Sequence, residues 1–130
     1  MNAFAPTPNI GDILTRPKLQ GLIEHCGVVI GHDAVLHNTP ERGEHLTSVR
    51  EFSAGQPMQA RPTGINPQIV SARSRKILTN PKRYDAVNRN CQHTVSEVVC
   101  GIAKSPLVLA VILIGIIATI IIAVHLMRNR

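Results

Sequence analysis

The feature that most constrains the fold of this chain is an apolar run near its C-terminus, LVLAVILIGIIATIIIAV at residues 107–124. Only the small residues Gly115 and Thr119 interrupt it. Together with residues 125–127, the run reaches the roughly 20 residues that a helix needs to cross about 30 Å of hydrocarbon. A globular domain of about 100 residues has no core wide enough to surround such a helix on all sides, so the run predicts a membrane span.

The residues that flank this run mark the two ends of the predicted helix. Ser105 and Pro106 suit the N-cap and the first helical position, and Arg128 and Arg130 suit the opposite membrane interface. The N-terminal stretch MNAFAPTPNI lacks the basic and apolar regions of a signal peptide. We therefore expect a single-pass tail anchor, with the rest of the chain on the cytoplasmic side of the membrane.

Two histidines lie in the segment EHCGVVIGHDAVLHNTP at residues 24–40, a pattern that is typical of a β-hairpin. Side chains alternate between the two faces of a strand, so the pairing register decides whether His25 and His37 share a face. If they do, they are diagonal neighbours about 7–8 Å apart, and both imidazoles can converge on one reacting group.

The register depends on the turn between the two strands. A three-residue loop at 31–33 pairs Ile30 with Ala34 and Val29 with Val35, and this register puts both histidines on one face. A loop of two or four residues would reverse the parity and separate them. The Gly and Asp residues of the turn permit the three-residue loop without dictating it.

A second segment, NRNCQHTVSEVVCG at 88–101, predicts an amphipathic helix that starts at Cys91. Its apolar stripe at helical spacing is formed by Cys91, Val95, Val98, Val99 and Ile102. Asn88 or Asn90 can act as the N-cap, leaving free N–H groups of the first turn around the sulfur, where they could also hold an oxyanion. A helix N-terminus and a nearby imidazole both lower the pKa of a thiol, so the two segments together predict a cysteine nucleophile with a histidine base.

These residues could also have structural or metal-binding roles. A buried helical cysteine is usually a small apolar residue, and a strand histidine is usually a satisfied polar group. A zinc site formed by His25, His37 and Cys91 would lack a strong fourth ligand. His93 lies on another side of the helix and is expected to cap it or to hydrogen-bond locally, and Cys100 is too far round the helix to join Cys91. The combination favours a catalytic site that needs neither metal nor cofactor.

Three motifs in order resemble the lecithin:retinol acyltransferase-like family, whose close relatives are the H-rev type phospholipase/acyltransferases. They are GDIL at 11–14, the hairpin HCGVVIG…VLHNTP, and NCQHT, and the resemblance covers residues 11–103. It implies a circularly permuted NlpC-type papain-like fold. It also implies that Cys91 is the acyl-accepting nucleophile, His25 the general base, and His37 the polar third member that orients His25.

The chain departs from the family pattern at two positions. The aromatic residue that usually follows the first histidine is Cys26 here, and the one that usually follows the histidine of NC-x-H is Thr94. The stretch between His37 and Cys91 also looks short for vertebrate members. The resemblance therefore implies the chemistry of the family more directly than a particular substrate.

These observations predict a membrane-tethered cysteine acyl hydrolase or acyltransferase that acts on lipid esters through an acyl-Cys91 intermediate. Membrane lipids would be its substrates and acyl donors. One alternative is a papain-like amidase or peptidase, including a hydrolase of cell-wall peptides. The other is a catalytically inactive tail-anchored adaptor.

The net charge of +6 arises between residues 61 and 89. The basic residues of this segment, opposed only by Asp85, are Arg61, Arg73, Arg75, Lys76, Lys82, Arg83 and Arg89. Near anionic headgroups each would contribute about 1 kcal/mol of binding, although a solvated loop is an equal alternative.

Nucleic-acid binding is not expected, because Phe4, Phe52 and Tyr84 are the only aromatic residues. Three cysteines, an odd number, suit a reducing compartment.

The predicted organisation is an N-terminal extension (1–10), a papain-like domain (11–104), a transmembrane anchor (105–127) and a short tail (128–130). We expect the domain to be α+β, with a small antiparallel sheet of about four strands packed on the Cys91 helix. LTSVREFS at 46–53 suggests a short strand, and NPQIVSARSRKIL at 66–78 a strand or a helix of one to two turns.

Overall fold

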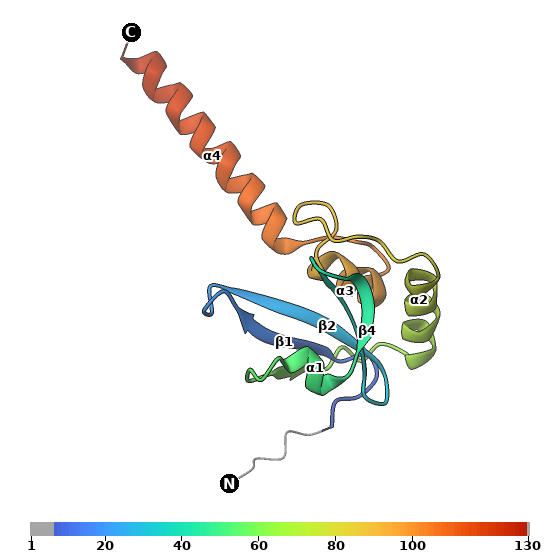
Figure 1. Cartoon of the computed structure of the whole chain (residues 1–130). Coiled ribbons are helices and arrows are strands. Elements are labelled where there is room, and N and C mark those ends of the chain that lie inside the picture. Colours follow the sequence, from blue (N-terminus) through green and yellow to red (C-terminus); the bar gives the residue numbers. More distant parts are fainter. Residues whose placement is uncertain (1–6, 130) are drawn as a thin grey trace.

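A computed structural model describes residues 7–129 as an α+β domain from which one long helix projects (Figure 1). A five-stranded antiparallel sheet has the order β4-β3-β2-β1-β5. Its strands are β1 (Ile13–Lys18), β2 (Ile23–Gly31), β3 (Ala34–Thr39), β4 (Gly43–Thr47) and β5 (Gln59–Arg61). The helices are α1 (Val49–Ser53), α2 (Pro67–Thr79), α3 (Cys91–Cys100) and α4 (Pro106–Arg128). The predicted α+β class is confirmed, with one strand more than expected. Residues 1–6 of the expected N-terminal extension, including Phe4, and Arg130 of the tail lie outside the described part.

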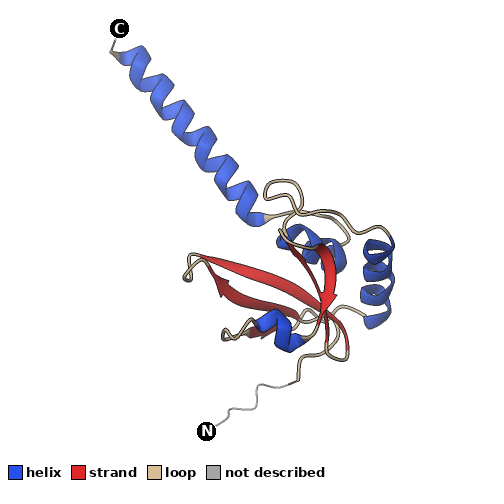
Figure 2. Ribbon diagram, viewed as in Figure 1, coloured by secondary structure: helices blue, strands red, loops and turns tan. Residues whose placement is uncertain are grey.

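The sheet separates two apolar clusters, with α2 and α3 on one face and α1 on the other (Figure 2). The cluster under α2 and α3 comprises Ile13, Cys26, Val28, Leu36, Val70, Ile77, Cys91, Val95 and Val98. The cluster under α1 comprises Leu14, Val29, Val35 and Phe52. Because successive side chains of a strand point to opposite faces, β2 contributes to both clusters. The predicted packing of the sheet on the Cys91 helix is confirmed.

The β2–β3 hairpin has the predicted parity but a different turn. Val29 pairs with Val35 and Gly27 with His37, as expected, whereas Ala34 pairs with Gly31 and not with Ile30. The register shifts between Val29 and Gly31, which leaves one extra residue in β2 as a β-bulge. A two-residue turn alone would have separated the histidines, and the bulge restores their common face.

Two segments form helices where strands were considered. The predicted strand at 46–53 is wrong beyond Thr47, because Ser48 caps α1 and its hydroxyl accepts a hydrogen bond from the Glu51 N–H. At 66–78 the strand alternative is wrong, and the helix is longer than one to two turns: α2 has 13 residues. Its N-cap is Asn66, followed by a proline at the first helical position, a strong helix-start signal.

The apolar stripe of α3 is shorter than predicted. The helix ends at Cys100, where Gly101 adopts a left-handed conformation with φ 77°. Ile102 lies beyond this cap and is 66% exposed, so its predicted place in the buried stripe is wrong.

The C-terminal helix α4 is long and apolar enough to span a membrane, and no residue in it is buried. Ser105 caps its first turn, with Pro106 at the first helical position, as predicted. The helix ends at Arg128, one residue beyond the expected anchor. Its exposure on all sides excludes a core helix of the described domain and is consistent with a tail anchor.

The contact between the domain and α4 yields a prediction about truncation. A chain that ends at Pro106 should be folded and soluble, because α4 adds no buried residue to the domain. A chain that ends at Lys104 also lacks Ser105, whose hydroxyl forms hydrogen bonds with Asn90 and Gln92. Its free energy of unfolding should be about 1 kcal/mol lower than that of the chain ending at Pro106. Urea unfolding followed by circular dichroism measures both chains.

Membrane attachment is tested with the full-length protein. A spanning helix should keep it in the membrane during extraction with alkaline carbonate, whereas a merely electrostatic contact would release it. If the chain ending at Pro106 aggregates or unfolds, α4 packs into the domain and the anchor interpretation fails.

Candidate active site

Cys91 is the first residue of α3 and is buried. Asn90 is the N-cap, and its side-chain oxygen accepts hydrogen bonds from the N–H groups of Gln92 (2.9 Å) and His93 (3.3 Å). His93 Nδ1 accepts from the Asn90 N–H at 3.1 Å, so the local capping role expected for His93 is confirmed. This cap already uses the N–H groups of Gln92 and His93. The expectation of free first-turn N–H groups around the sulfur therefore fails for Gln92 and His93, whose N–H groups donate to the cap.

His25 and His37 meet directly, with 2.8 Å between His25 Nε2 and His37 Nδ1. Both side chains are buried, and both rings pack against Phe52 of α1, with centroids 5.4 and 5.3 Å from it. Gly27 lies opposite His37 in the pairing register and makes this contact possible. A Cβ atom there would come within 2.8 Å of the Phe52 ring, so no larger residue fits.

The electrostatic surroundings keep His37 neutral. Its pKa is lowered to about 3, mainly because burial disfavours the charged imidazolium, and next because of the positive charges of His45 and His25. When both ring nitrogens of His25 carry protons, Nδ1 of the neutral His37 accepts a hydrogen bond from His25 Nε2–H, and the proton stays on His25. The Nδ1 atom of His25 then remains for Cys91.

Cys91 is predisposed to ionise. Its pKa is lowered to about 4, chiefly because the Cys26 thiol donates a hydrogen bond to the thiolate, and next because of a hydrogen bond from His25 and its charge, whereas burial acts in the opposite direction. The pKa of Cys26 is raised well above its usual value by the same partner. Cys26 thus stays protonated and acts as the donor in a thiol–thiolate pair.

Strand alternation explains how Cys91 contacts both neighbours. Cys26 belongs to the apolar cluster beneath α3, whereas His25 packs against Phe52 on the other face of the sheet. Pairing between β2 and β3 ends at Gly27, while β2 continues alongside β1 to Ile23. Because β3 no longer flanks β2 at residues 25 and 26, the start of α3 can approach both of them. The structure therefore brings Cys91, His25 and His37 together, as the sequence predicted.

Two residues near the site were not identified as functional from the sequence. Cys26 was noted only as a departure from the family pattern, although its place beside His25 in a strand puts it on the face of α3. His45 pairs with His37 across β3 and β4, with ring centroids 4.3 Å apart, and its Nδ1–H donates to the Gly43 carbonyl at 2.7 Å. The signal for His45 is a second hairpin, formed by β3 and β4, whose register pairs His45 with His37.

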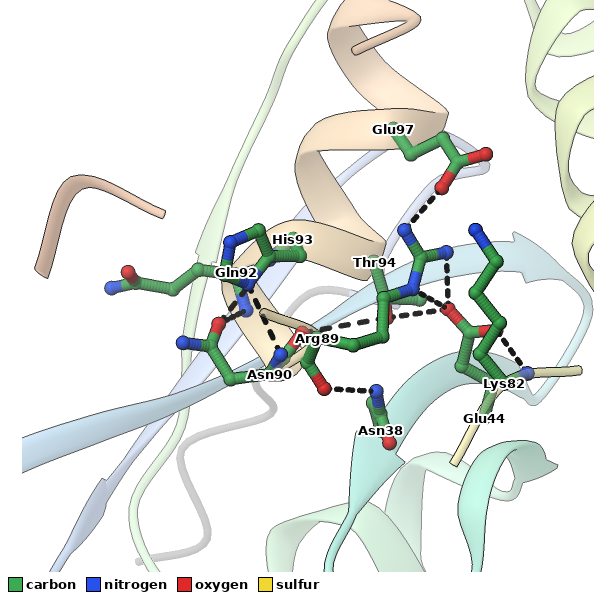
Figure 3. A network of polar contacts seen from close by, with 9 residues as sticks. All are labelled: Asn38, Glu44, Lys82, Arg89, Asn90, Gln92, His93, Thr94 and Glu97. Atoms are coloured by element: carbon green, nitrogen blue, oxygen red, sulfur yellow. Dashed lines mark hydrogen bonds and ion pairs between the residues drawn. The ribbon is translucent and has the colours of Figure 1, made fainter. Parts of the chain in front are cut away.

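A buried ion pair holds the segment before Cys91 against the sheet (Figure 3). The carboxylate of Glu44 on β4 accepts hydrogen bonds from Arg89 Nε (2.7 Å), Thr94 Oγ1 (2.8 Å) and the Lys82 N–H (2.8 Å). The Asn38 amide donates to the Arg89 carbonyl at 2.9 Å. Arg89 is only 6% exposed, so its predicted place in a basic surface segment is wrong.

A cavity of about 510 Å³ lies beside Cys91, between the β1–β2 hairpin and α3. Cys26 and Gln92, which neighbour Cys91 on strand and helix, line it together with the apolar residues Ile13, Val95 and Val99. The cavity reaches Pro106 at the start of α4. It is large enough for a segment of an acyl chain.

Within residues 7–129, no group of three or more His, Cys, Asp or Glu side chains is arranged to hold a metal ion. The structure thus gives no support to the zinc alternative. The chain matches no protein-family model and no curated protein. The roles of Cys91, His25 and His37 are therefore inferred from their geometry.

The thiol–thiolate pair yields a prediction about pH. Cys26→Ala removes the donor, so the pKa of Cys91 should rise and less thiolate should be present at acidic pH. A hydrogen bond to a charged group contributes about 1.5 kcal/mol, which corresponds to about one pKa unit, so the pH of half-maximal iodoacetamide labelling of Cys91 should rise by about one unit from about 4. Labelling at pH 9 should change little.

The labelling is measured by mass spectrometry in a Cys100→Ala background, which removes the exposed thiol. An unchanged pH profile would show that Cys26 does not stabilise the thiolate.

The neutral, buried His37 should make the fold sensitive to acid. Its pKa is about 3 when folded and 6.5 as a free side chain, so the unfolded state binds more protons between these values and stability falls as the pH drops below 6.5. At pH 5 this group alone should cost about 2 kcal/mol. His37→Gln should reduce the loss of unfolding free energy between pH 7 and pH 5, measured with urea in detergent micelles. An equal loss in both proteins would contradict the neutral state of His37.

Proposed function

We propose that this protein is a membrane-tethered cysteine acyl hydrolase or acyltransferase that acts on lipid esters. Its domain would be a lecithin:retinol acyltransferase-like, permuted papain-like unit on the cytoplasmic side of the membrane. The observation that carries the proposal is the pairing of His25 with a neutral His37 at 2.8 Å, beside a cysteine whose pKa is lowered to about 4.

In the first half-reaction the Cys91 thiolate attacks the ester carbonyl and forms a carbon–sulfur bond. The tetrahedral intermediate then breaks its bond to the alcohol oxygen, which takes the proton from His25 Nδ1. The products are an acyl-Cys91 thioester, the released alcohol and a neutral His25. His37 accepts the Nε2–H bond throughout and holds the imidazole in one orientation.

In the second half-reaction water, or an acceptor amine or alcohol, attacks the thioester. His25 Nδ1 takes the proton of the attacking group, and the Cys91 thiolate leaves. The site returns to its starting thiolate–imidazolium state. Water yields a fatty acid, whereas an amine or an alcohol yields an acylated product.

Two features support a lipid substrate. The exposed apolar helix α4 begins next to the cavity, and tethering to a bilayer raises the local concentration of acyl chains. Part of the cavity is lined by Ile13, Val95 and Val99, which suit an acyl chain. The charged residues Glu24, Arg61 and Lys104 also line it. These features favour lipid esters over the amidase alternative, which would use the same Cys91 and His25.

The nucleophile is tested by substitution. Cys91→Ser should abolish release of a fluorescent fatty acid from its ester in vesicles, while circular dichroism remains unchanged. Mass spectrometry of the intact protein without substitutions should show one added acyl group, and peptide mapping should locate it on Cys91. His25→Ala should slow turnover about 10²- to 10⁴-fold, as expected for the loss of a general base.

Cys100 lines the cavity but lies at the far end of α3 from Cys91. Cys100→Ser changes the side-chain volume little, so this matched control should stay active. An active Cys91→Ser variant would refute the mechanism. Cleavage of peptide substrates with no turnover of lipid esters would support the amidase alternative, and no turnover of either substrate would support the inactive adaptor.

A further inference from the structure

The start of α4 is fixed to the start of α3. The Ser105 hydroxyl donates to Gln92 Oε1 at 2.5 Å and accepts from Asn90 Nδ2 at 3.2 Å, and Gln92 Oε1 also accepts from the Leu107 N–H at 3.1 Å. Ser105 is only 2% exposed. Since Asn90 and Gln92 flank Cys91, the direction in which α4 leaves the domain is set by the same residues that position the nucleophile. A membrane that contains α4 therefore meets a defined side of the domain.

On that side the turn between β1 and β2 exposes two leucines. Leu22 is 84% exposed, the highest value among the large apolar residues of the described chain, and Leu19 is 62% exposed. In Figure 1 the β1–β2 turn projects from the same side of the domain as α4, whereas the first turn of α2 lies on the opposite side. The cavity links the two elements, because Thr15 and Glu24 line it from the hairpin and Pro106 lines it from α4.

The backbone of this turn is unusual for a water-facing loop. Leu19 and Gln20 adopt left-handed conformations with φ 50° and 56°, a region that non-glycine residues seldom occupy and that Asn, Asp or Gly fill more readily. The N–H groups of Gly21 and Leu22 donate to the carbonyls of Lys18 and Leu19, both at 3.1 Å. The turn thus presents apolar side chains and satisfies two of its own N–H donors, which lowers the cost of contact with lipid.

We propose that the β1–β2 turn is a second membrane contact, in which Leu19 and Leu22 enter the boundary between headgroups and acyl chains while α4 spans the bilayer. Lys18 beside the turn and Lys104 before α4 are placed to meet anionic headgroups. The cavity beside Cys91 then opens between two membrane-bound elements. The inference requires α4 to span the membrane, and it does not depend on catalysis.

The chain contains no tryptophan, so a single introduced tryptophan is a unique reporter. Three full-length variants, Leu22→Trp, Leu113→Trp and Ile69→Trp, are reconstituted into phosphatidylcholine vesicles with or without bromine on the acyl chains. Leu113→Trp within the apolar run of α4 reports insertion. Ile69→Trp in the first turn of α2 is the matched control, exposed but distant from α4. Bromine quenches only a tryptophan that reaches the acyl chains.

We expect Leu113→Trp to be quenched strongly, Leu22→Trp to lose roughly half of its emission, and Ile69→Trp to be unaffected. Equal behaviour of Leu22→Trp and Ile69→Trp would overturn the proposal. So would a blue-shifted but unquenched Leu22→Trp, which would indicate contact with a second protein copy. Failure to quench Leu113→Trp would overturn the premise that α4 spans. Repeating the measurement with Cys91→Ser keeps it independent of the proposed function.

Discussion

The ion pair between Glu44 and Arg89 is the interaction on which the arrangement of the site depends. The Glu44 side chain is fully buried, so its charge is stable only because Arg89, Thr94 and a backbone N–H satisfy its oxygens. Loss of one partner in such a pair usually costs about 3–5 kcal/mol, because the other charge stays buried and unpaired. Arg89 precedes the N-cap of α3, and this anchor on β4 sets where the helix begins and where the Cys91 sulfur lies.

Around this anchor, burial and mutual hydrogen bonds hold the groups at the site in complementary protonation states. Burial keeps His37 neutral, the Cys26 thiol remains protonated, and Cys91 is the group that ionises. Neutral donors and acceptors can orient a reacting pair without neutralising its charge. A buried carboxylate in place of His37 would instead hold the proton of His25 more firmly and make it a weaker acid toward a leaving group.

The sequence predicted the parts of the structure that follow local rules. The length of the apolar run defined α4, and helical spacing defined α3. Strand alternation put His25 and His37 on one face only for an assumed three-residue loop, whereas a two-residue turn with a β-bulge gives that register. It failed where a residue's environment depends on distant contacts. Arg89 belongs to a basic segment whose pattern predicts exposure to solvent. The structure instead buries it in an ion pair with Glu44 on β4. The importance of Cys26 likewise depends on which helix covers its face of the sheet, and alternation alone does not determine that.

The bulge in the β2–β3 hairpin bears on how relatives of this chain should be sought. His25 and His37 are 12 positions apart, but this interval includes the turn, where a residue can be gained or lost by exchanging the bulge for another loop. What the core fixes is the distance from each histidine to its own buried valine, His25 to Val29 and Val35 to His37, because these valines pair across the strands. A search profile that allows a gap between the two valines, and none outside them, would follow the physical constraint.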